Sequence, residues 1–374
     1  MKNRVVISGY YGFNNLGDEA VLYSMLHSLR RVVPGIEITV LSNDPSATAR
    51  EYGVTAVDRW NMRAVAGAIR RSQLLISGGG SLLQDVTGLQ SLLYYLVIIW
   101  TARLLRRPVM YYAQGIGPVN TRPGRILTGL TTRGARAVTV RDDESARDLK
   151  SMGVCRTVEV VADPVLGLHP DDIDLITGAD ILKRHGVMPG NCVVGVSVRP
   201  LPGPAADWEA ELAGALDLLA RAGRTVVFVP MHHPADLITS REIASLMKEQ
   251  HVIIGEKINV PQMLSLVANL DLLVGIRLHA LIFAAVGGVP PLGIVYDPKV
   301  ERFLRRINLA PAGTPEQIKA GDLAEMAELY ISEREQLRDK VSRRVDELRT
   351  AAGRPAEIVR ELLAVNQKPR TGGN

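Results

Sequence analysis

An arginine and a histidine lie two residues apart in the otherwise apolar run 274–283, which reads VGIRLHALIF. Arg277 follows a short β-branched pattern typical of a strand, and His279 stands where a helical pattern begins. In open α/β sheets, ligands bind beyond the carboxyl ends of the strands, where such a junction lies. A guanidinium group holds an anion through paired hydrogen bonds, and an imidazole can transfer a proton near neutral pH. The pair therefore predicts an anion site with a general acid, although a lone histidine can equally be a core residue bonded to a backbone carbonyl.

Two further cations follow other predicted strands in the same half of the chain. Arg199 comes after the strand pattern CVVGVSV, and Lys299 comes after the pattern LGIVY. Together with Arg277 and the free backbone N–H groups at the helix start, they suit a phosphate or a carboxylate. The alternative is that each cation forms a salt bridge with a neighbouring carboxylate. Three cations at the ends of three strands favour the anion site.

Other strand ends carry neutral and acidic groups. The N-terminal motif GYYGFNNLGDEA has the spacing of neither GxGxxG nor GxxxxGK[ST]. Asn14, Asn15 and Asp18 can hydrogen-bond a polyhydroxylated ligand, and Asp18 can equally cap the helix that follows. The motifs GGGSLLQD and AQGIGP add Asp85 and Gln114, with a ligand-free tight turn as the alternative. We expect Asn14, Asn15, Asp85 and Gln114 to contact a polyhydroxylated ligand.

Two further histidines, His232 and His233, follow the strand pattern TVVFVP in the motif MHHP. We expect them to line the edge of the site and assign them no chemistry. The sequence contains neither HExxH nor a cysteine pair with metal-ligand spacing, so we predict a site without a metal.

The elements that position these residues alternate between strands and helices, which predicts parallel sheets. The expected strands are 4–9, 37–42, 74–80, 108–117, 137–142 and 158–163, then 192–200, 225–233, 251–256, 271–277 and 290–297. The rhythm breaks around 165–190, and from Pro315 the chain is mostly helical. We expect an α/β protein of two Rossmann-type doubly wound lobes, 1–170 and 171–374, that face each other across a cleft. The helical tail is assigned to the second lobe, although it can also cross back to the first.

Composition excludes several classes of protein. The chain has 374 residues, more than one core usually serves, and its net charge of +5 is modest, without runs of like charge. Nucleic-acid binding is therefore not expected. Two cysteines and no signal-peptide pattern favour a cytoplasmic location. The apolar segment LLYYLVIIW is much shorter than the ~20 residues of a membrane-spanning helix.

The motifs GYYGFNNLGDEA, GGGSLLQD, AQGIGP, GIRLHALIFA and GIVYDPK together resemble the polysaccharide pyruvyltransferase family, in the right order over nearly the whole chain. The resemblance is greatest to the bacterial branch that modifies secondary cell-wall polymers used to anchor surface-layer proteins. It implies a GT-B-like fold, phosphoenolpyruvate as co-substrate with no cofactor, and a sugar acceptor that receives a 4,6-linked pyruvate ketal. In this branch the acceptor would be N-acetylmannosamine in a lipid-linked precursor at the inner face of the cell membrane.

The same resemblance implies roles for individual residues. Arg199, Arg277, Leu278 and Lys299 would bind the donor, and His279 would act as the general acid. Asp18 or Asp85 would be the base for the attacking hydroxyl. Arg103, Arg106 and Arg107 follow LLYYLVIIW and could meet anionic lipid, although an ordinary buried helix is the simpler interpretation.

Two other functions remain open at this point. A GT-B glycosyltransferase or epimerase that uses a nucleotide sugar would share the fold. It would also need an acidic residue that binds the ribose, and Glu256 lies in the sequence where such a residue is expected. A sugar-binding protein without catalysis is the third hypothesis, and the RLH motif argues against it.

Overall fold

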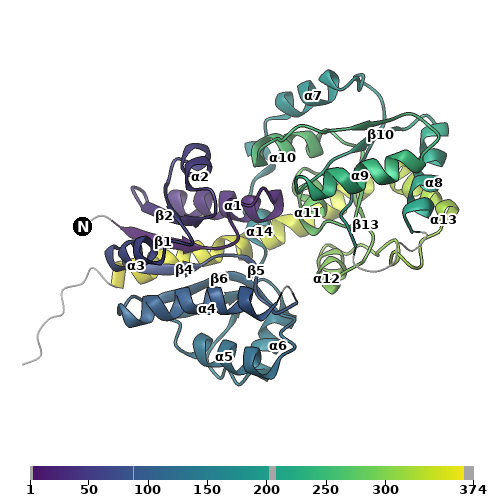
Figure 1. The fold of residues 1–374 in the computed structure, drawn as a ribbon. Helices are drawn as coiled ribbons and strands as arrows, with labels where there is room; N and C mark the ends of the chain where they lie inside the picture. The colour runs from purple at the N-terminus through teal and green to yellow at the C-terminus, as the bar shows by residue number, and fades with distance from the viewer. Residues whose placement is uncertain (1–2, 87, 202–207, 366–374) are drawn as a thin grey trace, which may run out of the picture. The chain divides into compact units, whose positions relative to one another are not determined.

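The computed structural model describes residues 3–86, 88–201 and 208–365. The chain divides into two compact units. Unit 1 comprises Met1–Asn14, Asp18–Gly167 and Leu348–Asn374, and unit 2 comprises Asn15–Gly17 and Leu168–Glu347. Figure 1 shows the course of the chain and the element labels used below.

The sheet of unit 1 is parallel, with strand order β3-β2-β1-β4-β6-β7-β8 and β5 paired with β6. Its strands are β1 (Arg4–Ser8), β2 (Glu37–Ser42), β3 (Thr55–Asp58), β4 (Leu74–Ser77), β5 (Gly80–Leu83), β6 (Val109–Ile116), β7 (Ala137–Val140) and β8 (Glu159–Val160). The helices between them are α1 (Leu16–Val32), α2 (Pro45–Tyr52), α3 (Met62–Arg71), α4 (Leu89–Leu104), α5 (Arg122–Arg133) and α6 (Asp143–Ser151). No strand was expected between 42 and 74, which was wrong, because this segment contains β3 as well as α2.

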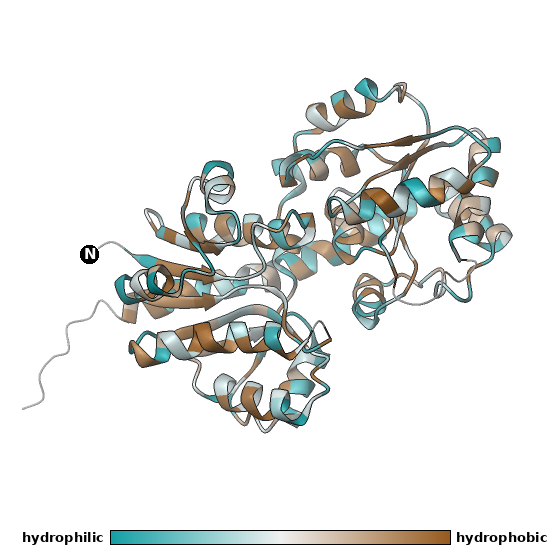
Figure 2. Cartoon of the chain, viewed as in Figure 1, coloured by the Kyte–Doolittle hydropathy of each residue, from teal (hydrophilic) through white to brown (hydrophobic). Residues whose placement is uncertain are grey.

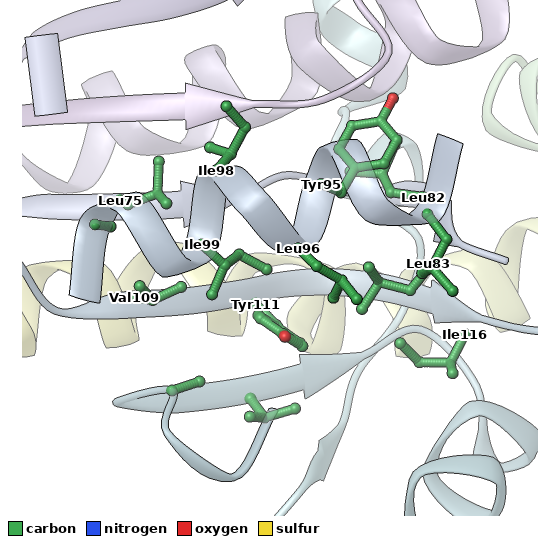
Figure 3. Packing of buried hydrophobic residues seen from close by; sticks show 14 of the residues in the cluster. Leu75, Leu82, Leu83, Tyr95, Leu96, Ile98, Ile99, Val109, Tyr111 and Ile116 are labelled. Atoms are coloured by element: carbon green, nitrogen blue, oxygen red, sulfur yellow. The ribbon is translucent and has the colours of Figure 1, made fainter. Parts of the chain in front are cut away.

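The apolar segment LLYYLVIIW lies within α4 and packs on the sheet. Figure 3 shows Leu96 and Ile99 of this helix facing Val109 and Tyr111 of β6. All four side chains are at most 1% exposed. Burial of apolar area contributes about 25 cal/mol per Å², so this contact stabilises unit 1. None of the helices in the described ranges is both long and apolar enough to cross a membrane.

The sheet of unit 2 is also parallel, with order β11-β10-β9-β12-β13. Its strands are β9 (Val193–Ser197), β10 (Thr225–Phe228), β11 (His251–Ile253), β12 (Leu272–Gly275) and β13 (Pro291–Gly293). Its helices are α7 (Leu175–Arg184), α8 (Trp208–Arg221), α9 (Ala235–Leu246), α10 (Val260–Ala268), α11 (Leu278–Val286), α12 (Pro298–Arg306) and α13 (Ala320–Ser332). Figure 2 shows hydrophobic residues concentrated on the strands and hydrophilic ones on the outer sides of helices such as α8 and α9. The predicted α/β class with two parallel-sheet units is confirmed.

The division of the chain differs in detail from the expected 1–170 and 171–374. The boundary falls after Gly167, and the long helix α14 (Arg334–Val365) belongs to unit 2 up to Glu347 and to unit 1 from Leu348. The part in unit 1 buries Ala352, Ala356, Val359 and Leu363, and Arg354 pairs with Glu159 at 3.0 Å. Chain order assigned this tail to the second lobe, whereas its apolar stripe is buried in the first.

Candidate active site

The predicted donor residues lie at the carboxyl ends of adjacent strands in unit 2. Hydrogen bonds continue past the strands, from Ile276 N to Ser197 O (3.0 Å) and from Ile294 N to Gly275 O (2.9 Å). Arg199 and Arg277 therefore leave the sheet from the neighbouring strands β9 and β12. The loop after β13 is the next along the same edge.

Arg199 and Lys299 share one aromatic partner, Tyr296. Arg199 Nη1 donates to Tyr296 Oη at 2.7 Å, and its guanidinium carbon lies 4.9 Å from the centre of that ring. Lys299 Nζ lies 5.7 Å from the same centre and 3.1 Å from an Asp297 carboxylate oxygen. Such contacts orient cations and reduce their freedom, so the cations from two loops are held close together before any ligand binds.

Arg277 has a different partner. Its Nε donates to Asp236 Oδ2 at 2.8 Å, and its Nη2 donates to the other carboxylate oxygen, Oδ1. The Asp236 side chain is fully buried and also accepts from Met231 N at 3.2 Å, while the Arg277 side chain is 14% exposed. A buried carboxylate requires such pairing, and in return it fixes the plane of the guanidinium group.

The salt-bridge alternative therefore holds for two of the three cations. Arg277 is paired with Asp236 and Lys299 with Asp297. Three positive charges against these two carboxylates leave one net positive charge, before His279 is counted. Pairing does not remove the anion site, because an arginine bound on one edge still presents N–H groups on the other.

The start of α11 adds backbone donors at the same edge. Arg277 is its N-cap residue and, among the described residues, its side chain forms no capping hydrogen bond. Leu278 is 7% exposed with its side chain in the core, so only its backbone N–H can serve a ligand. Helix N-termini with unsatisfied N–H groups favour anions.

His279 stands in the first turn of α11, partly exposed, beside the glycine of the motif NNLGD. A Cβ atom at Gly17 would lie 2.4 Å from His279 Nδ1 and 2.9 Å from its Cγ. Real Cβ atoms do not approach so closely, so glycine at this position leaves room for the imidazole. The sequence analysis noted this motif without recognising that Gly17 is required by the histidine.

Asn15 belongs with these residues rather than with unit 1. It forms a β-bridge with His232, and Leu16 N donates to Met231 O at 2.9 Å. Asn15 Oδ1 accepts from Gly17 N at 3.1 Å, which is the hydrogen bond of an N-cap. The cap of α1 is therefore Asn15, and Asp18, the alternative cap, lies inside the first turn. His233 is partly buried, and this burial and the charge of Lys257 lower its pKa.

Asp18 and Asn14 are in unit 1. Asn14 is exposed and adopts φ 58°, a left-handed conformation that is uncommon outside glycine. Asp18 is partly exposed, and a Cβ atom at Gly80 would lie 3.1 Å from its Oδ1. Glycine thus lets this carboxylate approach the backbone that follows β4. Desolvation raises the pKa of Tyr10, and the charge of Asp18 adds to that shift.

Asp85 is occupied by its own loop. Its carboxylate accepts from Asn120 N and Thr121 N, each at 2.8 Å, and from Thr121 Oγ1 at 2.7 Å. Desolvation opposes ionisation, but these hydrogen bonds outweigh it and lower the pKa of Asp85. Such a carboxylate is a weaker proton acceptor than an ordinary aspartate, and the geometry gives Asp85 a role in holding the start of α5.

Gln114 does not reach solvent. It lies in the middle of β6, is 0% exposed, and accepts from Ser77 Oγ at 2.9 Å. The expectation that its amide contacts a ligand is not supported by this position, because the side chain is buried and its oxygen is bonded to Ser77 of β4. The motif AQGIGP led to this expectation because a strand end and a strand centre look alike in an apolar run.

Sequence reasoning missed two residues of the site, Asp236 and Tyr296. Asp236 is the second residue after MHHP and could have been identified as an acid after a strand. Its partner Arg277, however, lies 41 positions away in the sequence. Tyr296 was quoted in GIVYDPK without a role. Glu256, the ribose-binding candidate of the rival hypothesis, is exposed and pairs with Arg184 (3.5 Å) and His185 (3.4 Å). Over the described ranges, no group of three or more His, Cys, Asp or Glu residues could hold a metal ion.

Solved structures with the same fold cover nearly the whole chain. Alr3699/HepE from Anabaena in complex with UDP-glucose is 14% identical, with a TM-score of 0.67 over 97% of this chain and 99% of that one. UDP-GlcNAc 2-epimerase from Neisseria meningitidis bound to UDP-GlcNAc is 11% identical, with a TM-score of 0.62 over 98% and 100%. A glycosyltransferase from Rickettsia africae is 10% identical, with a TM-score of 0.67 over 97% and 99%. Identities this low show the fold alone, which is that of GT-B-type sugar enzymes.

A comparison with curated proteins found no match. A family model described as polysaccharide pyruvyl transferase, however, matches residues 15–298. The matched range begins at the α1 cap and includes Asp236, Arg277, His279 and Tyr296. Because it covers most of the sequence, the chain belongs to the polysaccharide pyruvyl transferase family.

Proposed function

We propose that this enzyme transfers pyruvate from phosphoenolpyruvate to a sugar as a ketal and releases phosphate. The acceptor in this proposal is N-acetylmannosamine of a lipid-linked precursor of a secondary cell-wall polymer, modified at O4 and O6. The observation that carries it is the group of oriented cations and helix N–H donors at the carboxyl edge of unit 2, with His279 in the same helix turn.

Phosphoenolpyruvate carries a phosphate and a carboxylate as two substituents of one carbon atom, C2, so it needs two separate sets of donors. The Arg199 and Lys299 pair on Tyr296 is one set. Arg277 with the N–H groups of α11 is the other. An arginine fork fits a carboxylate or a phosphate through two parallel hydrogen bonds, whereas a neutral sugar gains little from such a charge.

His279 supplies the proton that starts the reaction. Its place in the first turn of α11 puts the imidazole beside the backbone N–H groups that would bind the anionic donor. General acid catalysis of this type contributes a factor of about 10² to 10⁴ in rate.

The reaction begins at the methylene carbon of phosphoenolpyruvate. His279 protonates this carbon, which becomes a methyl group, and C2 becomes oxocarbenium-like. One sugar hydroxyl attacks C2 and loses its proton to a base, for which Asp18 is our candidate. Phosphate leaves as its C–O bond breaks, and the second hydroxyl closes the ketal and gives its proton to the departing phosphate. Asp18 then releases the first hydroxyl proton, and His279 takes up one proton in place of the one it gave.

A lipid-linked acceptor would require the enzyme to approach a membrane surface. Arg103 and Arg106 are exposed at the end of α4, and Leu104 between them is 84% exposed. Each basic residue near anionic lipid contributes about 1 kcal/mol. We propose peripheral contact at the inner face of the cell membrane, which places the enzyme in the cytoplasm. Binding to vesicles with and without anionic lipid, in the wild type and in Arg103→Glu/Arg106→Glu, tests this contact.

The decisive experiment follows phosphate release from phosphoenolpyruvate with a synthetic lipid-linked N-acetylmannosamine acceptor present or absent, and detects the ketal carbon by NMR. We expect acceptor-dependent release that His279→Gln lowers about 10² to 10⁴-fold, with donor binding measured by calorimetry largely kept. His169→Gln is the matched control, because His169 is an exposed histidine that caps a short helical turn and follows none of the strands of unit 2.

Two results would overturn the proposal. If the wild-type enzyme does not react with phosphoenolpyruvate but binds and turns over a nucleotide sugar, the glycosyltransferase or epimerase hypothesis is supported. The similar solved structures that contain UDP-sugars are the reason to test it. Wild-type enzyme that binds the saccharide and turns over neither donor would be a sugar-binding protein without catalysis.

A further inference from the structure

A cluster of aromatic rings surrounds Arg59 in unit 1. The guanidinium carbon lies near four ring centres, namely those of Tyr94 (4.2 Å), Phe13 (5.0 Å), Trp60 (5.2 Å) and Tyr95 (5.5 Å). Arg59 is only 3% exposed, and its Nη1 donates to Gly9 O at 3.0 Å. A buried arginine with aromatic neighbours on several sides is a rigid anchor, since each contact restricts the same planar group.

The indole of Trp60 stands on this anchor and faces solvent, with 60% of its surface exposed. Its Nε1 donates to Asn43 Oδ1 at 3.0 Å, and its backbone N donates to Asp58 Oδ1 at 2.9 Å. Tryptophan is highly buried on average, and its N–H usually finds a partner even where the ring is exposed. The ring is therefore held in one orientation instead of being buried.

A second pair of rings flanks the anchor. Phe13 and Tyr10 stack with centres 4.0 Å apart and planes 5° from parallel. Both come from the motif GYYGFNNLGDEA, whose aromatic residues the sequence analysis left without a role. Both are partly exposed. Arg59 contacts Phe13 and Trp60, so it joins the two exposed aromatic groups.

The cluster lies where a ligand is expected. Tyr10 and Phe13 follow β1, Asn43 follows β2, and Arg59 and Trp60 follow β3. These three strands are neighbours, and their carboxyl ends form one edge of the parallel sheet. Open α/β sheets bind ligands beyond that edge.

The charges beside the cluster indicate what kind of ligand fits. Asp44 and Asp58 are exposed carboxylates in the loops that carry Asn43 and Trp60. They repel a phosphate and accept hydrogen bonds from hydroxyl groups, and the one cation of the cluster, Arg59, is buried under the rings. A neutral pyranose has hydroxyl donors on its edge and partly positive C–H groups on its face, which suit carboxylates and the negative face of an indole. A nucleotide fits this surface poorly.

We propose that Trp60, anchored by Arg59 and flanked by Phe13, is a stacking platform for a pyranose ring of the saccharide acceptor. Asn43 and Asp58 accept hydrogen bonds from its hydroxyl groups. That this saccharide is the acceptor rests on the proposed pyruvyl transfer. The platform replaces Gln114 and Asp85, which are buried or engaged, as the acceptor contacts of unit 1.

The test measures saccharide binding by saturation-transfer NMR and calorimetry with the full chain and a disaccharide that ends in N-acetylmannosamine, without phosphoenolpyruvate. We expect Trp60→Ala to weaken binding about tenfold or more, the usual cost of truncating a central aromatic contact, and Trp60→Phe to weaken it less. Trp100→Ala is the matched control, because Trp100 is 38% exposed and its Nε1 also donates to a side chain, Thr131 Oγ1. Thermal unfolding verifies that each variant is folded.

Two outcomes overturn the platform. One is a wild type that does not bind the saccharide, or that binds it no more strongly than Trp60→Ala does. The other is Trp60-dependent binding of uridine monophosphate in place of the sugar. Kinetics separate this inference from the proposed function. If phosphate release depends on the acceptor and Trp60→Ala leaves the acceptor KM unchanged, pyruvyl transfer is supported and the platform is contradicted. If sugar binding depends on Trp60 but no phosphate is released, the platform is supported and the transfer is contradicted.

Discussion

The carboxyl edges of the two sheets carry opposite kinds of surface on the same scaffold. In unit 2 the loops present cations whose orientation is fixed by carboxylates and a tyrosine, at Arg277–Asp236 and Arg199–Tyr296. In unit 1 Arg59 is buried under aromatic rings, and Trp60 faces solvent beside acidic side chains. Each unit places its chemistry in the loops after parallel strands. In both units the fold decides where these loops lie, while the residues of the loops decide whether the surface is cationic or aromatic and acidic.

The largest expected effect comes from breaking the carboxylate that fixes Arg277. Asp236→Asn removes a buried charge and leaves the guanidinium group without an ionic partner on that side. We expect the free energy of unfolding to fall by about 3 to 5 kcal/mol, as for other buried pairs that lose one member. The KM for phosphoenolpyruvate should also rise, because the fork is no longer oriented. Urea unfolding and steady-state kinetics measure the two effects.

Asp85→Asn is the comparison for this variant, since its carboxylate serves a loop of unit 1. It should leave the KM for phosphoenolpyruvate unchanged. If Asp236→Asn kept the wild-type KM while it remained folded, the proposed contrast between an oriented anion site and the edge of unit 1 would lose its main support.

A second prediction concerns Glu19, which lies beneath the aromatic loop of unit 1. Desolvation raises its pKa to about 7, against the hydrogen bonds from Gly12 N (2.7 Å) and Tyr52 Oη (2.8 Å). Because the folded pKa lies above the unfolded value of 4.5, the folded state binds the proton more tightly. This contribution to stability is complete below pH 4.5 and is lost as the pH rises through about 7, amounting to about 3 kcal/mol.

Glu19→Gln should therefore flatten the pH dependence of unfolding between about pH 5 and 8, measured as urea midpoints in a pH series. The exposed Glu325, on α13 of unit 2, provides the control as Glu325→Gln. If the urea midpoint of the wild type does not fall between about pH 5 and 8, the pH sensitivity assigned to unit 1 is wrong. The loop carrying Phe13 would then not be coupled to a buried carboxyl group.

The smallest effect is expected for Tyr296→Phe, which sharpens the description of the anion site. The variant keeps the ring beneath Arg199 and Lys299 but loses the 2.7 Å hydrogen bond to Arg199. A hydrogen bond to a charged group contributes about 1.5 to 3 kcal/mol, of which water will replace a part, so we expect the KM for phosphoenolpyruvate to rise about tenfold with little change in kcat. Tyr296→Leu, which also removes the ring, should have the larger effect. Equal effects of the two variants would show that the ring does not position the cations.

The local pattern of the sequence determined much of this protein. Alternating strand and helix patterns predicted parallel sheets, and motif order predicted the family, which the family match confirms. The pattern also placed Arg199, Arg277 and Lys299 after their strands correctly. These inferences succeed because hydrophobic periodicity and strand-to-helix junctions are properties of neighbouring residues.

Only the tertiary structure decided the partners of those residues. Asp236 lies 41 positions from Arg277, and Tyr296 lies 97 positions from Arg199, and they meet because crossover connections bring distant strand ends to one edge. The same holds for Trp60 beside Asn43 and for the tail from Leu348 in unit 1. Burial separated Gln114 from the usable polar groups, because a polar residue within an apolar run carries no local sign of whether its side chain reaches water.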